Sequence, residues 1–210
     1  LLKMIKLSSS KKIFSGEVSL ESSKSISNRI LLIKALSNQN FKIANLSYSD
    51  DTALMLKFIE NYNKVKEIDC HHAGTTLRFL TAFLSVSDGN WILKGSERMH
   101  KRPVGPLVEC INKIGGNIKY IEKRNYPPLK VTGRNIEGGS VDIKGNISSQ
   151  FISALLMIAP RLKKGLTINI KSKILSRPYI HMTLSLMEKM GITHKWSNNL
   201  ISIKSQSYVC

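Results

Sequence analysis

The sequence predicts an α/β protein in which one structural unit occurs three times. Three observations lead to this prediction. Each unit opens with a helix whose first turn is rich in Ser, Thr or Gly and whose body is apolar on nearly all sides. A short β-like stretch follows, and then a second, more amphipathic helix. Because a helix that is apolar all round must be buried, we expect an inside-out α/β barrel of three βαβαββ-like units, with helices inside and sheets outside.

The opening helices are expected at residues 25–36, 73–84 and 148–158. All three first turns offer hydroxyl groups or unpaired backbone N–H groups. They read Ser25-Ile26-Ser27-Asn28-Arg29, Ala73-Gly74-Thr75-Thr76 and Ser148-Ser149-Gln150. Taken singly, each is also what a plain N-cap or a tight turn into a core helix would look like.

The remaining elements follow each opening helix in the same order. The β-like stretches lie at residues 41–46, 91–94 and 166–170, and the second helices at 49–62, 103–114 and 178–190. Glycine ends the last two of these helices, at Gly115-Gly116 and Gly191, as a helix-stop signal. Further strands are expected at 117–121 and 192–196.

Composition limits the class of protein. The chain has 210 residues with 42% hydrophobic content, enough for a real core, and no apolar stretch long enough to span a membrane. Leu1 to Met4 is too short for the apolar region of a signal peptide. The three cysteines, Cys70, Cys110 and Cys210, are odd in number and form no metal-ligand pair. We therefore expect reduced thiols, a cytoplasmic protein and no metal site.

A net charge of +18 indicates an anionic partner without naming it. The lysines are scattered, and Trp91 and Trp196 are not interleaved with basic residues as stacking platforms for nucleic acid would be. We expect no nucleic-acid or membrane partner. A non-catalytic anion-binding or nucleic-acid-binding module stays open as an alternative, as does a compositional bias of the source.

The most informative stretch is Ser23-Lys24-Ser25-Ile26-Ser27-Asn28-Arg29, which runs directly into the apolar residues 30–33. It places two cations and several hydroxyls at the start of a helix, which suits a phosphate or a carboxylate. A Ser-capped surface helix with solvated cations is the plainer interpretation. If the three opening helices begin at one face, their donors and dipoles converge there. We therefore predict an anion site at that face.

Two Arg-Pro pairs precede second helices, at Arg102-Pro103 and Arg177-Pro178. The planar guanidinium suits a bidentate grip of phosphate or carboxylate. Either arginine could instead be a solvated surface residue, and we expect at least one of them to face the ligand.

Seven stretches, in the same order and over nearly the whole chain, carry a family resemblance. They are residues 23–29, 49–52, 73–78, 98–103, 126–129, 148–151 and 176–179. Together they resemble the N-terminal half of the 5-enolpyruvylshikimate-3-phosphate synthases (3-phosphoshikimate 1-carboxyvinyltransferases). The resemblance implies one lobe of the enolpyruvyl transferase type, and transfer of the enolpyruvyl group of phosphoenolpyruvate to the 5-hydroxyl of shikimate 3-phosphate. Phosphate is released through a tetrahedral ketal, in chorismate and aromatic amino acid biosynthesis, without metal or organic cofactor.

The resemblance also implies the roles of individual residues. Lys24 is expected to contact both substrates, and Gln150 to lie near both. The residues expected to hold shikimate 3-phosphate are Ser25, Arg29, Ser148, Ser149, Ser176 and Tyr179. Those expected to hold phosphoenolpyruvate are Gly74 and Arg102, with Arg78 near that pocket.

The chain departs from the family pattern at three places. Glu21-Ser22 stands where Pro-Gly is usual, His71-His72 where Gly-Asn is usual, and Phe79 where many members have Pro. We interpret both histidines as loop residues, because no Cys, His or carboxylate spacing completes a metal site.

The resemblance covers the first of two similar lobes. Residues 21–210 are expected to form the shikimate-3-phosphate-binding lobe, and residues 1–20 strands that pack with the second lobe and fray or expose an unpaired edge without it. The resemblance implies that the acid/base carboxylates belong to that second lobe. Asp50 and Asp51 look like helix-start residues, so neither is assigned as the general acid or base. We expect a monomer that binds substrate but does not turn over alone. The alternatives are a UDP-N-acetylglucosamine enolpyruvyl transferase, whose family opens with a Lys-Asn phrase, and a ligand-incompetent structural fragment.

Overall fold

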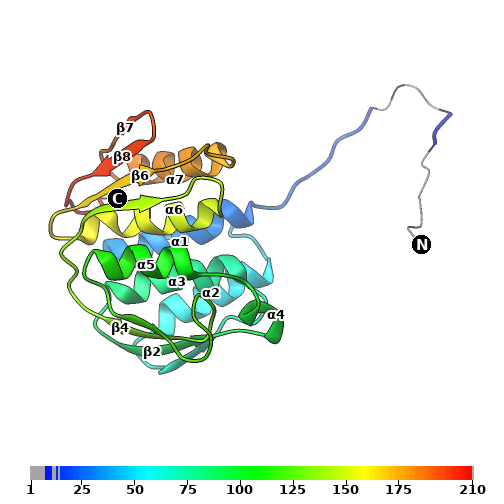
Figure 1. Ribbon diagram of the computed structural model, residues 1–210. Helices are drawn as coiled ribbons and strands as arrows, with labels where there is room; N and C mark the ends of the chain where they lie inside the picture. The colour runs from blue at the N-terminus through cyan, green and yellow to red at the C-terminus, as the bar shows by residue number, and fades with distance from the viewer. Residues whose placement is uncertain (1–7, 11–12, 14, 210) are drawn as a thin grey trace.

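The computed structural model describes residues 8–10, 13 and 15–209. Two four-stranded sheets lie on opposite sides of a layer of helices (Figure 1). The helices are α1 (Lys24–Ser37), α2 (Asp50–Asn61), α3 (Gly74–Ser85), α4 (Glu97–His100), α5 (Gly105–Lys113), α6 (Ser149–Ile158) and α7 (Arg177–Lys189), with a 3₁₀ turn at Ala159–Arg161. The chain is thus a mixed α/β protein, as predicted.

The two sheets have the same topology. The first holds β1 (Glu67–Asp69), β2 (Gly89–Lys94), β4 (Leu129–Gly133) and β3 (Ile118–Tyr120), in that order. The second holds β5 (Gly139–Ile143), β6 (Leu166–Ile170), β8 (Leu200–Ile203) and β7 (Lys195–Ser197). In each sheet the first two strands are parallel and the rest antiparallel.

Each parallel pair needs a helical crossover, and a buried helix supplies it. α3 joins β1 to β2, and α6 joins β5 to β6. All twelve residues of α3 are buried, as is the segment of α6 from Phe151 to Ile158. The two apolar helices therefore form the centre of the core, as their sequences predicted.

The first unit has no sheet in the described part of the chain. The strand expected at residues 41–46 is wrong: this segment is irregular, with Phe41, Ile43 and Leu46 half-buried against the core. A strand needs a hydrogen-bonded neighbour, and none of the described strands lies beside it. Strand 192–196 is displaced too, because β7 begins only at Lys195.

The expected N-terminal strands lie partly outside the described residues. Residues 15–20 have no regular secondary structure, and Val18 and Leu20 are exposed. Figure 1 shows this segment leaving the helical layer and running away from it. The pairing of residues 1–20 with a second lobe stays a prediction.

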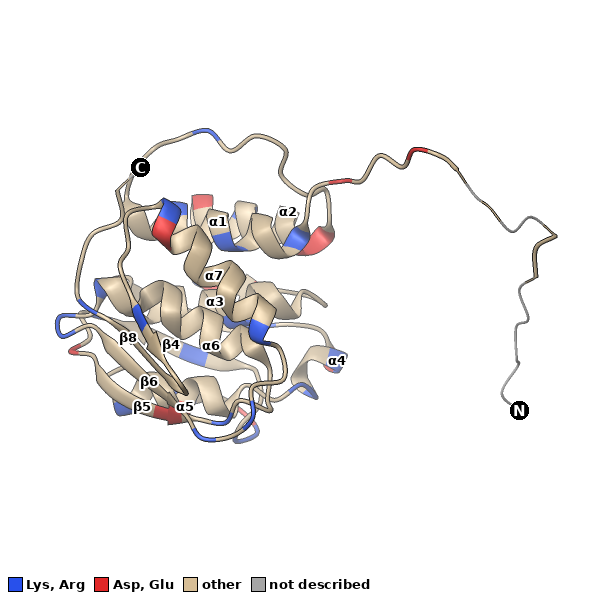
Figure 2. Cartoon of the chain, turned by 90° about the horizontal axis from the view of Figure 1, so that it is seen from above, with Lys and Arg blue, Asp and Glu red and all other residues tan. Residues whose placement is uncertain are grey.

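The described residues contain no helix long and apolar enough to cross a bilayer. They also contain no group of three or more His, Cys, Asp or Glu side chains that could hold a metal ion. Cys70 and Cys110 are buried free thiols, while Cys210 lies outside the described residues. Lys and Arg are distributed over helices, strands and loops around the molecule (Figure 2).

Candidate functional site

A pocket of about 330 Å³ lies where α1, α3, α6 and α7 begin. The convergence of the three opening helices was predicted, and the start of α7 joins them. Nine residues line the pocket: Lys24, Ser25, Arg29, Thr75, Ser148, Ser149, Gln150, Ser176 and Tyr179. Eight of them are residues singled out from the sequence, and the ninth, Thr75, belongs to the first turn of α3.

The helix ends supply hydrogen-bond donors to this pocket. Ser148 Oγ caps α6 by accepting from Gln150 N at 3.3 Å, so its hydroxyl proton is available for donation. Ser176, at the N-cap of α7, makes no such capping bond. α3 starts after Ala73, whose methyl side chain cannot accept a hydrogen bond from the first N–H groups of the helix. Hydroxyl and backbone donors therefore gather at one end of the helical layer, where an anion is favoured.

Arg29 is the most deeply buried of the pocket cations, with 2% of its surface exposed. Its guanidinium donates to Thr183 Oγ1 at 2.7 Å, to the Ser25 carbonyl at 2.8 Å and to Ser153 Oγ at 3.0 Å. All three acceptors are neutral, and burial lowers the pKa of Arg29 to about 10. The guanidinium also lies over the rings of Phe79 and Tyr179, with Cζ 5.4 Å and 5.9 Å from their centroids. A buried cation with these neutral partners, and with no carboxylate of the described residues beside it, favours an anion in the pocket.

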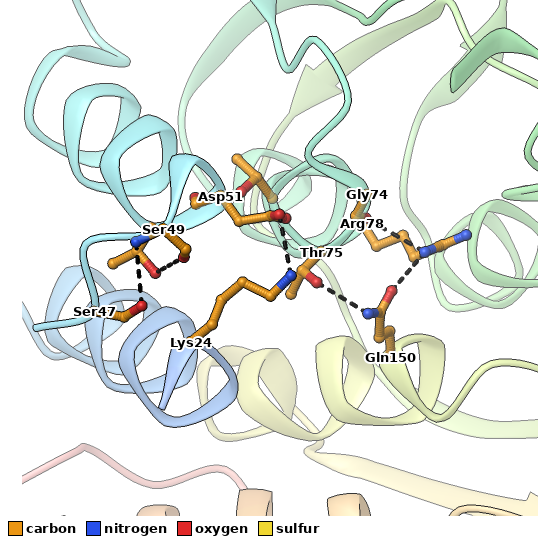
Figure 3. A network of polar contacts seen from close by, with 10 residues as sticks. Lys24, Ser47, Ser49, Asp51, Gly74, Thr75, Arg78 and Gln150 are labelled. Atoms are coloured by element: carbon orange, nitrogen blue, oxygen red, sulfur yellow. Dashed lines mark hydrogen bonds and ion pairs between the residues drawn. The ribbon is translucent and has the colours of Figure 1, made fainter. Parts of the chain in front are cut away.

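Arg78 is a second buried cation, on the next turn of α3 from the pocket. It donates to Gln150 Oε1 at 2.5 Å and to the Gly74 carbonyl at 3.5 Å (Figure 3). Gln150 Nε2 in turn donates to Thr75 Oγ1 at 3.0 Å. Burial, and next the charge of Arg102, lower the pKa of Arg78 to about 10. Arg78 therefore fixes the Gln150 amide at the pocket wall and keeps its own positive charge close behind it.

Arg102 does not line the main pocket but lies immediately beside it. A Cβ added to Gly74 would stand 2.9 Å from Arg102 Cζ and 3.2 Å from Arg78 Nη1. Only a glycine lets the two guanidinium groups come this close to the start of α3. Arg102 lines a neighbouring pocket of about 160 Å³ with His72, Arg98 and Met99.

Lys24 reaches across to the start of α2, where its Nζ lies 3.2 Å from Asp51 Oδ2 (Figure 3). Its side chain is 46% exposed, so it can also turn toward a ligand. Asp51 does start a helix as predicted, but its contact with Lys24 was not foreseen. No local pattern could have shown this contact, because the two residues come from different helices.

The Arg-Pro pattern alone left both Arg102 and Arg177 open, whereas the family resemblance named Arg102. Arg177 lies over the ring of Trp196, with Cζ 4.7 Å from the centroid, and does not line the pocket. His71 and His72 are loop residues, as predicted, in the turn before α3. Neither pocket is lined by a carboxylate of the described residues.

Comparison with known proteins shows to which family the chain belongs. The family model described as EPSP synthase (3-phosphoshikimate 1-carboxyvinyltransferase) matches residues 9–67 and 59–207. The chain belongs to the EPSP synthase family. A relative from Bacteroides fragilis (strain YCH46), named 3-phosphoshikimate 1-carboxyvinyltransferase, is 45% identical over 194 residues, which cover 92% of this chain and 47% of the relative. A relative of the same name from Colwellia psychrerythraea is 40% identical over 202 residues, which cover 85% of this chain and 47% of that relative.

The fold agrees with solved members of the EPSP synthase family. The EPSP synthase from Acinetobacter baumannii superposes with a TM-score of 0.81 at 17% identity, over 92% of this chain and 48% of that one. At this identity the likeness concerns the fold alone. The chain spans about half the length of the EPSP synthase relatives it matches.

Proposed function

We propose that this chain is the shikimate-3-phosphate-binding lobe of a 3-phosphoshikimate 1-carboxyvinyltransferase. The complete enzyme transfers the enolpyruvyl group of phosphoenolpyruvate to the 5-hydroxyl of shikimate 3-phosphate and releases phosphate. The observation that carries the proposal is Arg29, a buried cation with only neutral partners in a pocket where four helices begin. Membership of the family agrees with it.

The charges divide the site between two ligands. We assign the main pocket to shikimate 3-phosphate, whose phosphate suits Arg29 and the hydroxyls that line the same hollow. Those hydroxyls belong to Ser25, Ser148, Ser149, Ser176 and Tyr179. We assign phosphoenolpyruvate to the side of Gly74, Arg78 and Arg102, where two guanidinium groups approach one glycine. Gln150 lines the main pocket and also accepts from Arg78, and we assign it, together with Lys24, to both ligands.

The contribution of this lobe to the reaction is positioning and charge neutralisation. Bringing two anions together costs electrostatic energy, which fixed cations and helix N-termini offset. The chemistry is an addition of the 5-hydroxyl to the enolpyruvyl carbon followed by elimination of phosphate. The only carboxylate in contact with a pocket cation, Asp51, is paired with Lys24 in the described residues. We therefore place the acid/base groups in the second lobe and expect substrate binding without turnover here.

We propose further that α1 and α2 belong to the first of three units. In the described part of the chain the other two units each have a sheet outside their helices, whereas the first unit has no sheet and its Ile26 and Tyr48 are exposed. Strands from residues 1–20 and from the second lobe would supply it and complete an inside-out barrel. On this proposal the enzyme is a monomer of two lobes, and its reduced buried thiols suit the cytoplasm.

Calorimetric titration with shikimate 3-phosphate tests the proposal. Saturable binding to the wild-type chain should disappear in the Lys24→Ala, Arg29→Ala double variant. A Lys119→Ala, Arg124→Ala variant removes the same charge from exposed positions outside both pockets and should bind as the wild type does. Equal loss in both variants would reduce the effect to general electrostatic attraction and refute the assigned site.

A further inference from the structure

The smaller pocket, beside Arg102, contains a group that the proposed function has not used. It is lined by His72, from the turn before α3, and by Arg98, Met99 and Arg102, from α4 and the residues that follow it. Its volume of about 160 Å³ suits a small group such as a phosphoryl. On its other side His72 borders a hollow that also includes Asp50, Asp51, Lys57 and His71. His72 thus stands between an acidic side and a strongly basic one.

A hydrogen bond to Ser96 fixes the ring of His72. Ser96 Oγ lies 2.7 Å from His72 Nδ1, and the same oxygen accepts from Met99 N at 3.3 Å as the N-cap of α4. Ser96 N also donates to the His71 carbonyl at 3.0 Å, which ties the two segments together. The two segments that line the pocket are therefore held in register by one serine.

One neutral form of the imidazole fits this bonding pattern with Ser96 as the donor. Because Ser96 Oγ already accepts from Met99 N, its own proton is available, and Nδ1 lies within reach of it. A neutral ring that accepts at Nδ1 carries its proton on Nε2. The neighbouring His100 is turned elsewhere, since its Nε2 accepts from Gly95 N at 3.5 Å. His72 is then the histidine that can present an N–H to the pocket.

We propose that His72 is an anion-binding residue, whose Nε2–H donates to a phosphoryl oxygen held between Arg98 and Arg102. Two guanidinium groups supply charge and in-plane donors, and the imidazole adds a donor from a third direction. The inference rests on the proposed function, in that the phosphoryl group is the one of phosphoenolpyruvate. It goes further in giving a role to a residue at which this chain departs from its family.

Nuclear magnetic resonance on the ¹⁵N-labelled chain tests the inference directly. Long-range ¹H–¹⁵N spectra should show the His72 ring protonated at Nε2 and accepting at Nδ1, and inorganic phosphate should shift the Nε2–H signal. Phosphoenolpyruvate should do the same, whereas pyruvate, which offers only a carboxylate, should not. Protonation at Nδ1, or a His72 ring unmoved across the phosphate titration, would overturn the proposal. An equal response to pyruvate would overturn the phosphoryl assignment.

The affinities of substituted variants for inorganic phosphate test the inference independently. His72→Phe should weaken phosphate binding about ten- to a hundredfold, the factor that one charge-assisted hydrogen bond supplies. His72→Asn, which keeps an N–H donor, should recover part of the affinity for phosphate that His72→Phe loses. His71→Phe is the matched control, because His71 lies next in the chain but does not line this pocket. Equal effects at positions 71 and 72 would overturn the proposal.

Arg102→Ala separates this inference from the proposed function. If Arg102→Ala weakens phosphate binding but His72→Phe does not, only the role of His72 fails. If Arg102→Ala leaves phosphoenolpyruvate binding unchanged, the assignment of this side to phosphoenolpyruvate fails. Both positions lie outside the core, and unfolding curves should confirm that each variant is folded.

Discussion

Replacing Arg29 by Met should largely abolish the binding of shikimate 3-phosphate, while the chain itself stays folded. Burial lowers the pKa of Arg29 from 12.5 to about 10, which corresponds to a cost of about 3 kcal/mol for keeping the charge at neutral pH. The three hydrogen bonds to Thr183, Ser25 and Ser153 offset it, at about 1.5 kcal/mol each for bonds donated by a charged group. The substitution removes both terms, so the free energy of unfolding should change by no more than about 2 kcal/mol.

The assay is urea unfolding with and without shikimate 3-phosphate. A ligand at a hundred times its Kd raises the free energy of unfolding by about 2.7 kcal/mol, and this increment should be seen in the wild type and be largely lost in Arg29→Met. Arg124→Met, at an exposed position, is the control and should keep the increment. A loss of more than about 4 kcal/mol without ligand would show that Arg29 is a structural residue and refute the reasoning.

Three further predictions concern other parts of the chain. Gly74→Ala should displace the Arg102 guanidinium and weaken phosphate binding about tenfold, while thermal unfolding shows stability kept or raised by about 0.5 to 1 kcal/mol, since Ala favours helix. Burial raises the pKa of Cys110 to about 11 and that of Cys70 still further, so peptide mass spectrometry should find neither thiol labelled at neutral pH unless urea is present. The ion pair with Lys163 lowers the pKa of Glu137, so the group stabilises the fold above pH 4.5 and loses this effect as the pH falls through the lowered value. The stability difference between wild type and Glu137→Gln at pH 7 should therefore shrink as the pH falls below 4.5 through the lowered pKa, and a difference that stays constant over this range would contradict the assignment.

The helices and the converging site were predictable because both depend on local pattern. A segment such as Phe151 to Ile158, apolar on every side, must be buried in any compact fold. The capping residues at the start of such a segment then lie at the end of the buried layer. This is why serines 148 and 149, far from Lys24 in the chain, could be placed beside it in advance.

What could not be predicted depends on partners far along the chain. Residues 41–46 form a β-like stretch that includes Phe41 and Ile43, yet a strand forms only where another chain segment pairs with it. Arg102 and Arg177 carry the same Arg-Pro pair, but Arg177 lies over the ring of Trp196 and does not line the pocket, which the pair itself could not show. Thr75 was missed as a site residue because its role is to hold Gln150 through a side-chain contact.

The hydrogen bonds of Arg29 also bear on how the chain folds. They join α1 to Ser153 and Thr183, which lie 124 and 154 residues further along the chain. Contacts of such sequence separation form late, since the loop between them must close first. Among the described residues, the first helix is thus completed by the last, and the capacity to bind shikimate 3-phosphate should return only in the final phase of refolding. Substrate affinity would then serve as a kinetic marker for the finished core.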